Sequence, residues 1–215
     1  MIEKLGVIGT GGHAKVIVDI GIRKNPEQWF SFFTSNIAKA RITHPFLAYS
    51  IYPDSPSEIS QRMKGISFWH VAIGDPFIRQ EKVDSIEKLG GLLHSMIHDQ
   101  CTIATQTRIG SGTSVMAGVV LNPYVRIGKG CIINTASSID HDCQIDDFVN
   151  IGPGVRVAGG VQIGKLTELG TGAIVIPNIS IGASCIIGAG AVVTQNIPDY
   201  CVAVGVPAKV IRQNK

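Results

Sequence analysis

His141 has an aspartate on either side, Asp140 and Asp142. An aspartate that accepts a hydrogen bond from one imidazole nitrogen fixes the tautomer of the ring and raises its basicity, so that the other nitrogen can remove a proton. This chemistry is needed when an amine or a hydroxyl attacks an activated carbonyl. We predict His141 as a general base, with Asp142 as its partner and Asp140 as the lesser candidate, although the residues alone leave a structural histidine open.

A second chemical signal lies in the glycine-rich segment 9–14, Gly-Thr-Gly-Gly-His-Ala, which follows an apolar run. The segment fits the G-x-G-x-x-G/A pattern, in which glycines let the backbone approach a diphosphate and the next helix supplies free N–H groups. A tight turn without a ligand is the alternative. NAD is not expected, because segment 33–36, Phe-Thr-Ser-Asn, has no carboxylate where that cofactor needs one.

The elements that must position these residues follow a six-residue period from residue 97 to residue 193. All 17 residues at this spacing are isoleucine, leucine or valine, without an insertion. They are Ile97, Ile103, Ile109, Val115, Leu121, Ile127, Ile133, Ile139, Ile145, Ile151, Val157, Ile163, Leu169, Val175, Ile181, Ile187 and Val193. Such a period indicates a solenoid. We expect each unit to be a short strand and a turn, with three units per coil of a prism.

Four of the five cysteines, Cys101, Cys131, Cys143 and Cys185, occur two residues before one of these apolar positions. We predict that they fill the core as small apolar side chains, because free cysteine packs in that way. Disulfides are therefore not expected. A metal site is not expected either, since one histidine lies within the repeat and zinc requires several converging ligands.

Residues 1–96 have a different pattern, in which strand-like and helix-like segments alternate. We expect strands at 4–9, 29–33, 68–74 and 92–97, helices at 12–23, 55–63 and 78–89, and a loop with at most one short strand at 36–56. Alternation of this kind indicates a parallel sheet with helices on its faces. The predicted domains are a Rossmann-like α/β domain, 1–96, and a β-helix domain, 97–215.

Composition sets limits on the class of protein. The net charge is +3, which requires neither a nucleic acid nor a membrane surface as partner. No apolar stretch reaches the roughly 18 residues of a membrane span, and no signal peptide precedes the first apolar run. We therefore expect a soluble cytoplasmic protein.

Several segments together resemble the NeuD/PglD-type sugar acyltransferases of the hexapeptide-repeat superfamily. They are segment 9–14, Ala-Ile-Gly-Asp at 72–75 with Arg79, Ile97-His98, Ile-Asn-Thr at 133–135, Ile-Asp-His-Asp-Cys at 139–143 and Val-Gly-Val-Pro-Ala-Lys at 204–209. The resemblance covers nearly the whole chain in order. It implies a left-handed β-helix, a homotrimer and acetyl-CoA as co-substrate, bound in the groove between neighbouring subunits.

The resemblance also implies roles for individual residues. His141 would be the base and Asp142 would raise its basicity, while Asn134 would touch the sugar. The remaining residues are assigned to the nucleotide-sugar, Gly11, Gly12, His13, Thr34 and Ser35, or to the acetyl-CoA groove, Asn150, Thr171 and Ala189. Asn150 stands where the family commonly has a histidine, and Thr34 and Ser35 stand where it usually has acidic residues that bind the base.

The activity expected from this resemblance is N-acetylation of a nucleotide-linked amino-sugar, by direct transfer in a ternary complex. One alternative is an O-acetyltransferase that acts on a free sugar such as a sialic acid. Such an enzyme has less need of the glycine-rich turn. Another alternative is a non-catalytic β-helix scaffold or sugar-nucleotide sensor, which the combination of Asn134, His141 and Asp142 argues against.

Overall fold

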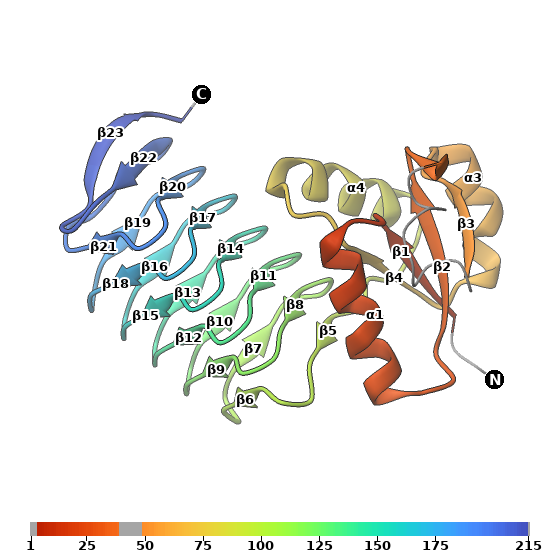
Figure 1. Cartoon of the computed structure of the whole chain (residues 1–215), viewed down its shortest axis with the longest axis horizontal. Coiled ribbons are helices and arrows are strands. Elements are labelled where there is room, and N and C mark those ends of the chain that lie inside the picture. The colour runs from red at the N-terminus through yellow and green to blue at the C-terminus, as the bar shows by residue number, and fades with distance from the viewer. Residues whose placement is uncertain (1–3, 39–48, 215) are drawn as a thin grey trace. The chain divides into compact units, whose positions relative to one another are not determined.

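The computed structural model in Figure 1 describes residues 4–38 and 49–214. Contacts divide the chain into two compact units, Met1–Asp99 and Gln100–Lys215. The division lies three residues beyond the predicted boundary at residue 96. Each unit has its own core and is described separately below.

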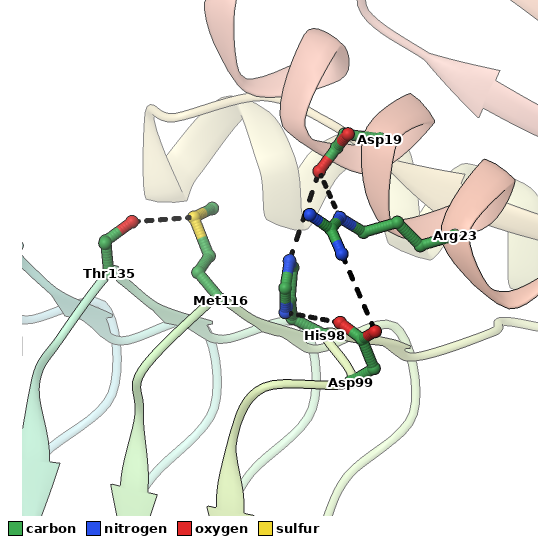
Figure 2. Close-up of polar contacts among 6 residues, drawn as sticks. All are labelled: Asp19, Arg23, His98, Asp99, Met116 and Thr135. Atoms are coloured by element: carbon green, nitrogen blue, oxygen red, sulfur yellow. Dashed lines mark hydrogen bonds and ion pairs between the residues drawn. The ribbon is translucent and has the colours of Figure 1, made fainter.

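The last residues of the first unit are attached to its first helix by polar and charged side chains (Figure 2). His98 Nδ1 lies 2.9 Å from an Asp99 carboxylate oxygen, and its Nε2 lies 4.0 Å from Asp19 of the helix. Arg23 lies between the two carboxylates, 3.2 Å from Asp19 and 3.7 Å from Asp99. These contacts explain why the first unit extends beyond residue 96.

The first unit contains a parallel sheet with the strand order β3-β2-β1-β4. Its strands are β1 (Lys4–Ile8), β2 (Trp29–Thr34), β3 (Ser50–Pro53) and β4 (Phe68–Val71), and its helices are α1 (Gly12–Lys24), α3 (Pro56–Arg62) and α4 (Pro76–Lys88), with a 3₁₀ turn at Met63–Gly65. Phe30 and Phe32 of β2 pack with Ile17 and Ile20 of α1 in the core. The predicted alternation of strands and helices is confirmed.

Side chains mark where two of the helices begin. The hydroxyl of Ser55 accepts a hydrogen bond from the Glu58 N–H at the start of α3. The carboxylate of Asp75 accepts from the N–H groups of Phe77 and Ile78 at the start of α4. Both helices also have proline in the first turn, where its missing N–H has no cost.

The fourth strand of the sheet is a correction to the sequence prediction. Of the segment predicted at 92–97, only Met96–Ile97 forms a strand, and Leu93 contributes an isolated bridge to Trp69. The carbonyl of His94, next along the chain, lies 2.9 Å from Nδ1 of His70. The fourth strand is β3, which is the one short strand allowed for within the predicted loop at 36–56. Residues 39–48 of that loop lie outside the described residues.

The repeat forms two-residue strands, and each ends on one of the 17 predicted apolar residues. They are β5 (Met96–Ile97), β6 (Thr102–Ile103), β7 (Arg108–Ile109), β8 (Ser114–Val115), β9 (Val120–Leu121), β10 (Arg126–Ile127), β11 (Ile132–Ile133), β12 (Ser138–Ile139), β13 (Gln144–Ile145), β14 (Asn150–Ile151), β15 (Arg156–Val157), β16 (Gln162–Ile163), β17 (Glu168–Leu169), β18 (Ile174–Val175), β19 (Ser180–Ile181), β20 (Ile186–Ile187) and β21 (Val192–Val193).

Strands stack in parallel register with an offset of 18 residues, as in Arg126 opposite Gln144, so three units complete one coil as predicted. Three faces result, which we call B (β8, β11, β14, β17 and β20), C (β6, β9, β12, β15, β18 and β21) and D (β7, β10, β13, β16 and β19). The hairpin of β22 (Cys201–Val204) and β23 (Lys209–Gln213) continues face B beyond β20. Figure 1 shows the coils in succession.

The core of the prism is the axial stack of apolar side chains with the small residues two positions before them. All five cysteines are free. The thiols of Cys131, Cys143 and Cys185 lie within hydrogen-bonding distance of carbonyls 3.0–3.1 Å away, on Asp146, Ala158 and Pro198. Burial raises the pKa of the Cys143 and Cys185 thiols, which keeps them protonated and unreactive. Cys131, Cys143 and Cys185 are buried, as predicted for small side chains that fill the core, whereas Cys101 is only partly buried.

Candidate functional site

His141 projects from the corner of the prism between β12 on face C and β13 on face D. Its side chain is 61% exposed, and its Nδ1 lies 2.8 Å from a carboxylate oxygen of Asp142. An ionised carboxylate only accepts hydrogen bonds, so Nδ1 carries the proton and Nε2 keeps its lone pair. Asp142 has φ 59°, a left-handed conformation that aspartate tolerates at a turn. The ring is therefore exposed at this corner, with Nε2 as its basic nitrogen.

Asp140 supports this corner without contacting the ring through a hydrogen bond. Its Oδ1 accepts from the backbone N–H of His141 and from the amide of Asn122, both at 2.8 Å. These two hydrogen bonds lower the pKa of Asp140, the backbone one most strongly. Asp140 thus stays ionised and fixes the backbone from which the imidazole projects.

The two carboxylates set the basicity of the imidazole. The hydrogen bond to Asp142 raises the pKa of His141 above its ordinary value, and the negative charge of Asp140 adds to the effect. Nearby anions favour the imidazolium form, so the neutral ring is a stronger base than free histidine. This arrangement can take a proton from a nucleophile that approaches Nε2.

Gly159 is a component of the corner that the sequence pattern did not reveal. Gly159 lies one coil after His141. A Cβ atom on Gly159 would come within 2.7 Å of the His141 ring. Only glycine leaves this side of the ring unobstructed. A search for glycines one coil away from the histidine would have found it.

The other predicted residues of the β-helix lie elsewhere. Asn150 is on face B, and its amide donates a 2.8 Å hydrogen bond to Glu168 on the next coil. Asn134, Thr171 and Ala189 lie at the corner between faces B and C. This corner is distinct from the one that carries His141. One chain therefore does not bring the two sets of residues together.

The first unit contains a pocket of about 700 Å³ at the carboxyl ends of its strands. It is lined by Gly9, Thr10, Gly11, Gly12, Lys15, Thr34, Ser35, Asn36, Asp54, Ile73, Ile78, Glu81 and Lys82. Ligands of open parallel sheets bind at this edge, and the volume suits a nucleotide. Four of the predicted substrate residues, Gly11, Gly12, Thr34 and Ser35, are in its wall.

The glycine-rich turn is shaped for close approach of a ligand. Gly9 has φ 107°, and a side chain there would meet the Ala72 carbonyl at 2.7 Å. Gly11 and Gly12 have open space where a Cβ would be. Helix α1 begins here without a side-chain cap or an acidic residue in its first turn. Its first N–H groups and positive dipole end therefore suit a diphosphate.

Thr34 and Ser35 differ in their surroundings. Thr34 is buried, and its hydroxyl accepts hydrogen bonds from the Thr10 hydroxyl at 3.3 Å and the Asn36 N–H at 3.2 Å. It connects the glycine-rich turn to the end of β2. Ser35 is exposed, at the mouth of the same pocket.

His13 is not among the residues that line this pocket. Its ring centroid lies 6.4 Å from that of His70, whose side chain is fully buried. Burial, together with His70 and Arg79, lowers the pKa of His13 to about 3. Arg79 is buried as well and donates to the carbonyls of Ile73 and Gly74 at 2.8 and 2.7 Å, which fixes the loop after β4. His13 is therefore neutral at physiological pH.

The sequence interpretation missed five residues of this pocket: Lys15, Asp54, Ile78, Glu81 and Lys82. Lys15 follows the glycine-rich turn, where a cation one helical turn from a diphosphate could have been expected. Asp54 and Lys82 have no local signal, because they meet only through the order of the strands and the position of α4.

Within residues 4–38 and 49–214, no group of three or more His, Cys, Asp or Glu side chains could hold a metal ion. Among the helices of the described part of the chain, none has both the length and the apolarity needed to cross a membrane.

A β-helix of hexapeptide repeats with an aspartate-paired histidine on its corner defines the class of hexapeptide-repeat acyltransferases. Residues 4–86 match the family model of the PglD N-terminal domain. Along 99% of both chains, at 36% identity and a TM-score of 0.90, the structure matches a perosamine N-acetyltransferase variant from Caulobacter crescentus. In that variant a histidine is replaced by asparagine, and CoA and GDP-perosamine are bound.

Two further relatives agree with this match. The acetyltransferase domain of PglB from Neisseria gonorrhoeae, solved with acetyl coenzyme A, is 30% identical with a TM-score of 0.86, over 98% of this chain and 100% of that one. GDP-perosamine N-acetyltransferase of Escherichia coli O157:H7 is 34% identical over 96 residues, which span 45% of this chain and 43% of that protein.

The chain belongs to the family of nucleotide-sugar N-acetyltransferases that combine a PglD-type N-terminal domain with a hexapeptide-repeat β-helix. The predicted fold class, an α/β domain followed by a left-handed parallel β-helix, is confirmed.

Proposed function

We propose that this chain transfers the acetyl group of acetyl-CoA to the amino group of a GDP-linked amino-sugar of the perosamine kind. The observation that carries the proposal is the exposed His141–Asp142 pair, in which Nδ1 lies 2.8 Å from the carboxylate and the imidazole is 61% exposed. The ligands bound to the relatives, CoA and GDP-perosamine, support the substrate class. The uncapped start of α1 in the 700 Å³ pocket supports a nucleotide diphosphate.

The proposed reaction is a direct transfer. The sugar nitrogen attacks the thioester carbonyl carbon, and Nε2 of His141 takes the proton that the nitrogen loses. The carbon–sulfur bond then breaks, and the CoA thiolate leaves with the proton that the His141 imidazolium gives up, which restores the neutral base. Holding two substrates in place contributes about 7 kcal/mol or more to lowering the barrier, and the base contributes about 100-fold in rate. Asp142 stabilises the imidazolium that forms.

The same proposal assigns the remaining residues. Gly11, Gly12 and Ser35 contact the nucleotide, and Asn134 contacts the sugar. Asn150, Thr171 and Ala189 line the acetyl-CoA groove. Thr34 acts through the turn that it holds, since its hydroxyl already accepts two hydrogen bonds.

We also propose a homotrimer. His141 and Asn150 are nine residues apart, and a coil takes 18, as the register of Arg126 and Gln144 shows. The two residues therefore point away from different sides of one prism. A groove that uses both must be formed by two copies, and a closed ring of three gives every copy the same groove. Because both substrates are cytoplasmic metabolites, we place the enzyme in the cytoplasm.

The test is a transfer assay with the full chain, acetyl-CoA and three acceptors: GDP-perosamine, a UDP-linked amino-sugar and free sialic acid. We expect thiol release with GDP-perosamine and a product that is heavier by one acetyl group and resists hydroxylamine, as an amide does. A hydroxylamine-labile ester on the free sugar would indicate an O-acetyltransferase instead.

Two variants locate the chemistry. His141→Ala should lower turnover by at least about 100-fold while the trimer persists in gel filtration. The control is Gln144→Ala, an exposed residue on the next strand, which should keep full turnover. Unchanged acetylation by His141→Ala would refute the role of the base.

A further inference from the structure

The nucleotide pocket is arranged along the strand order of its sheet. The glycine-rich turn follows β1, Ser35 follows β2, and Asp54 follows β3, and these strands are neighbours in the order β3-β2-β1. Adjacent strands are about 4.8 Å apart. A nucleotide with its diphosphate at the turn after β1 would place its ribose over β2 and its base towards β3. Asp54 is therefore at the base end of the pocket.

Asp54 is fixed there by two interactions. Its backbone N–H donates to the Thr34 carbonyl at 3.3 Å, which ties it to the end of β2. Its carboxylate lies 3.3 Å from Nζ of Lys82, which reaches across from α4. The two side chains are only 17% and 22% exposed, and both line the pocket.

The pair presents a defined pattern of acceptors and donors. The Asp54 carboxylate offers two acceptor oxygens and the Lys82 ammonium offers donors. The Watson–Crick edge of guanine has two adjacent donors, N1–H and the exocyclic N2 amine, next to the O6 acceptor. Uracil has a single donor between two carbonyls, and adenine has one donor and one acceptor. Among these bases, only guanine matches two acceptors beside a donor.

We infer that Asp54, positioned by Lys82, is the residue that selects guanine as the base of the substrate. The inference rests on the proposed function for the presence of a sugar nucleotide in this pocket. Asp54 accepts from N1–H and the N2 amine, and Lys82 donates to O6. The carboxylate that is missing from the end of β2 is thus supplied by the neighbouring strand, where it contacts the base.

Nucleotide binding tests the inference without any transfer step. Isothermal calorimetry on the full chain compares GDP, IDP and UDP. IDP differs from GDP only in lacking the N2 amine, so it leaves one Asp54 oxygen without a donor. We expect GDP to bind about tenfold more tightly than IDP, in line with the discrimination of a good bidentate contact. UDP should bind more weakly than both. Equal affinities of the unaltered protein for GDP and IDP would overturn the inference. This comparison uses no variant, so it does not depend on whether a variant folds.

Asp54→Asn keeps the size of the side chain and replaces one acceptor by a donor. It should reduce the preference for GDP over IDP to less than about threefold, because one charge-assisted contact is lost. Asp84→Asn is the matched control: the same substitution on α4, outside the pocket lining, should retain the preference of the unaltered protein. Circular dichroism melting of both variants checks that the fold persists. A retained preference in folded Asp54→Asn would also overturn the inference.

The binding and transfer results separate the two proposals. Acetyl transfer combined with equal binding of GDP and IDP leaves the proposed function intact and removes the role of Asp54. Guanine selection that depends on Asp54, without transfer to any acceptor, supports the inference and refutes the proposed function.

Discussion

Gly159 lies against the imidazole of His141, so that a Cβ atom on residue 159 would be 2.7 Å from both Cε1 and Nε2 of the ring. The two residues occupy equivalent corners of consecutive coils, and the N–H of Gly160 donates to the His141 carbonyl at 2.9 Å. The backbone of one coil thus forms the support for the ring of the other. The register of the prism sets the position of the proposed base.

Gly159→Ala should therefore displace the ring. A misplacement of about 1 Å lowers rates by about 100-fold, and we expect a loss of kcat of this order in the acetyl-transfer assay. The melting temperature should change little, because the ring is exposed and can move outward. Gly65→Ala, where the added methyl group meets nothing within 4 Å, is the control. Full turnover of Gly159→Ala would show that the ring position has no importance for the reaction.

Asp142→Asn should shift the pH dependence of kcat/KM. The base must be neutral to act, so the rate rises with pH through the pKa of His141. Asp142 raises that pKa. Its removal should move the acid limb to lower pH and lower the plateau by about 10-fold to 100-fold, because the neutral ring becomes less basic. Asp140→Asn should shift the limb less, since Asp140 is the smaller cause. An unshifted limb in Asp142→Asn would contradict the pairing.

His70 should make the stability of the first unit depend on pH. Burial lowers its pKa to about 4, below the value of 6.5 in the unfolded chain. The unfolded state thus binds more protons between these values, and the stabilising contribution, complete above pH 6.5, is lost as pH falls towards 4. Urea unfolding measures this loss. His70→Gln should reduce the slope of the free energy of unfolding against pH by about 1.4 kcal/mol per pH unit.

The pH experiment on His70 also involves Val71, which serves as a control, and His13, which titrates as well. Val71→Ala should lower the free energy of unfolding at every pH, because Val71 is 1% exposed, but should leave the slope of the unaltered protein. The stability of His70→Gln should still depend on pH to some extent, because the pKa of His13 is also lowered. Identical slopes in His70→Gln and the unaltered protein would exclude His70 as the titrating group.

The axial stack should carry the stability of the β-helix. Ile151 is fully buried and lies in register with Ile133 and Leu169. Ile151→Ala should lower the free energy of unfolding by about 2–5 kcal/mol, from lost burial and the cavity left behind. Ile211→Ala, at a side chain 58% exposed, should cost less than about 1 kcal/mol. Urea unfolding at one fixed protein concentration compares the two, and equal losses would contradict the axial role of Ile151.

The local sequence pattern was sufficient to predict the β-helix and to identify His141 as its candidate base. The six-residue period placed every two-residue strand from β5 to β21, because each unit is defined by its own residues and repeats the environment of the last. The sequence also predicted His141, between its two aspartates, as the candidate base, whereas its exposure follows from its place at the corner between β12 and β13. Within the first unit, the sequence predicted the alternation of strands and helices, but it assigned a strand to 92–97 that is reduced to Met96–Ile97.

Tertiary structure alone decided which residues share a site. Asp54, Lys82 and the glycine-rich turn meet in one pocket because β3, β2 and β1 are neighbours and α4 passes over their ends. His13 belongs to the glycine-rich motif, yet its ring faces buried His70 and not the pocket. A periodic pattern records contacts between equivalent positions of successive units, and the chain itself specifies these. Contacts between segments distant in sequence leave no periodic trace, since they depend on strand order, which no single segment encodes.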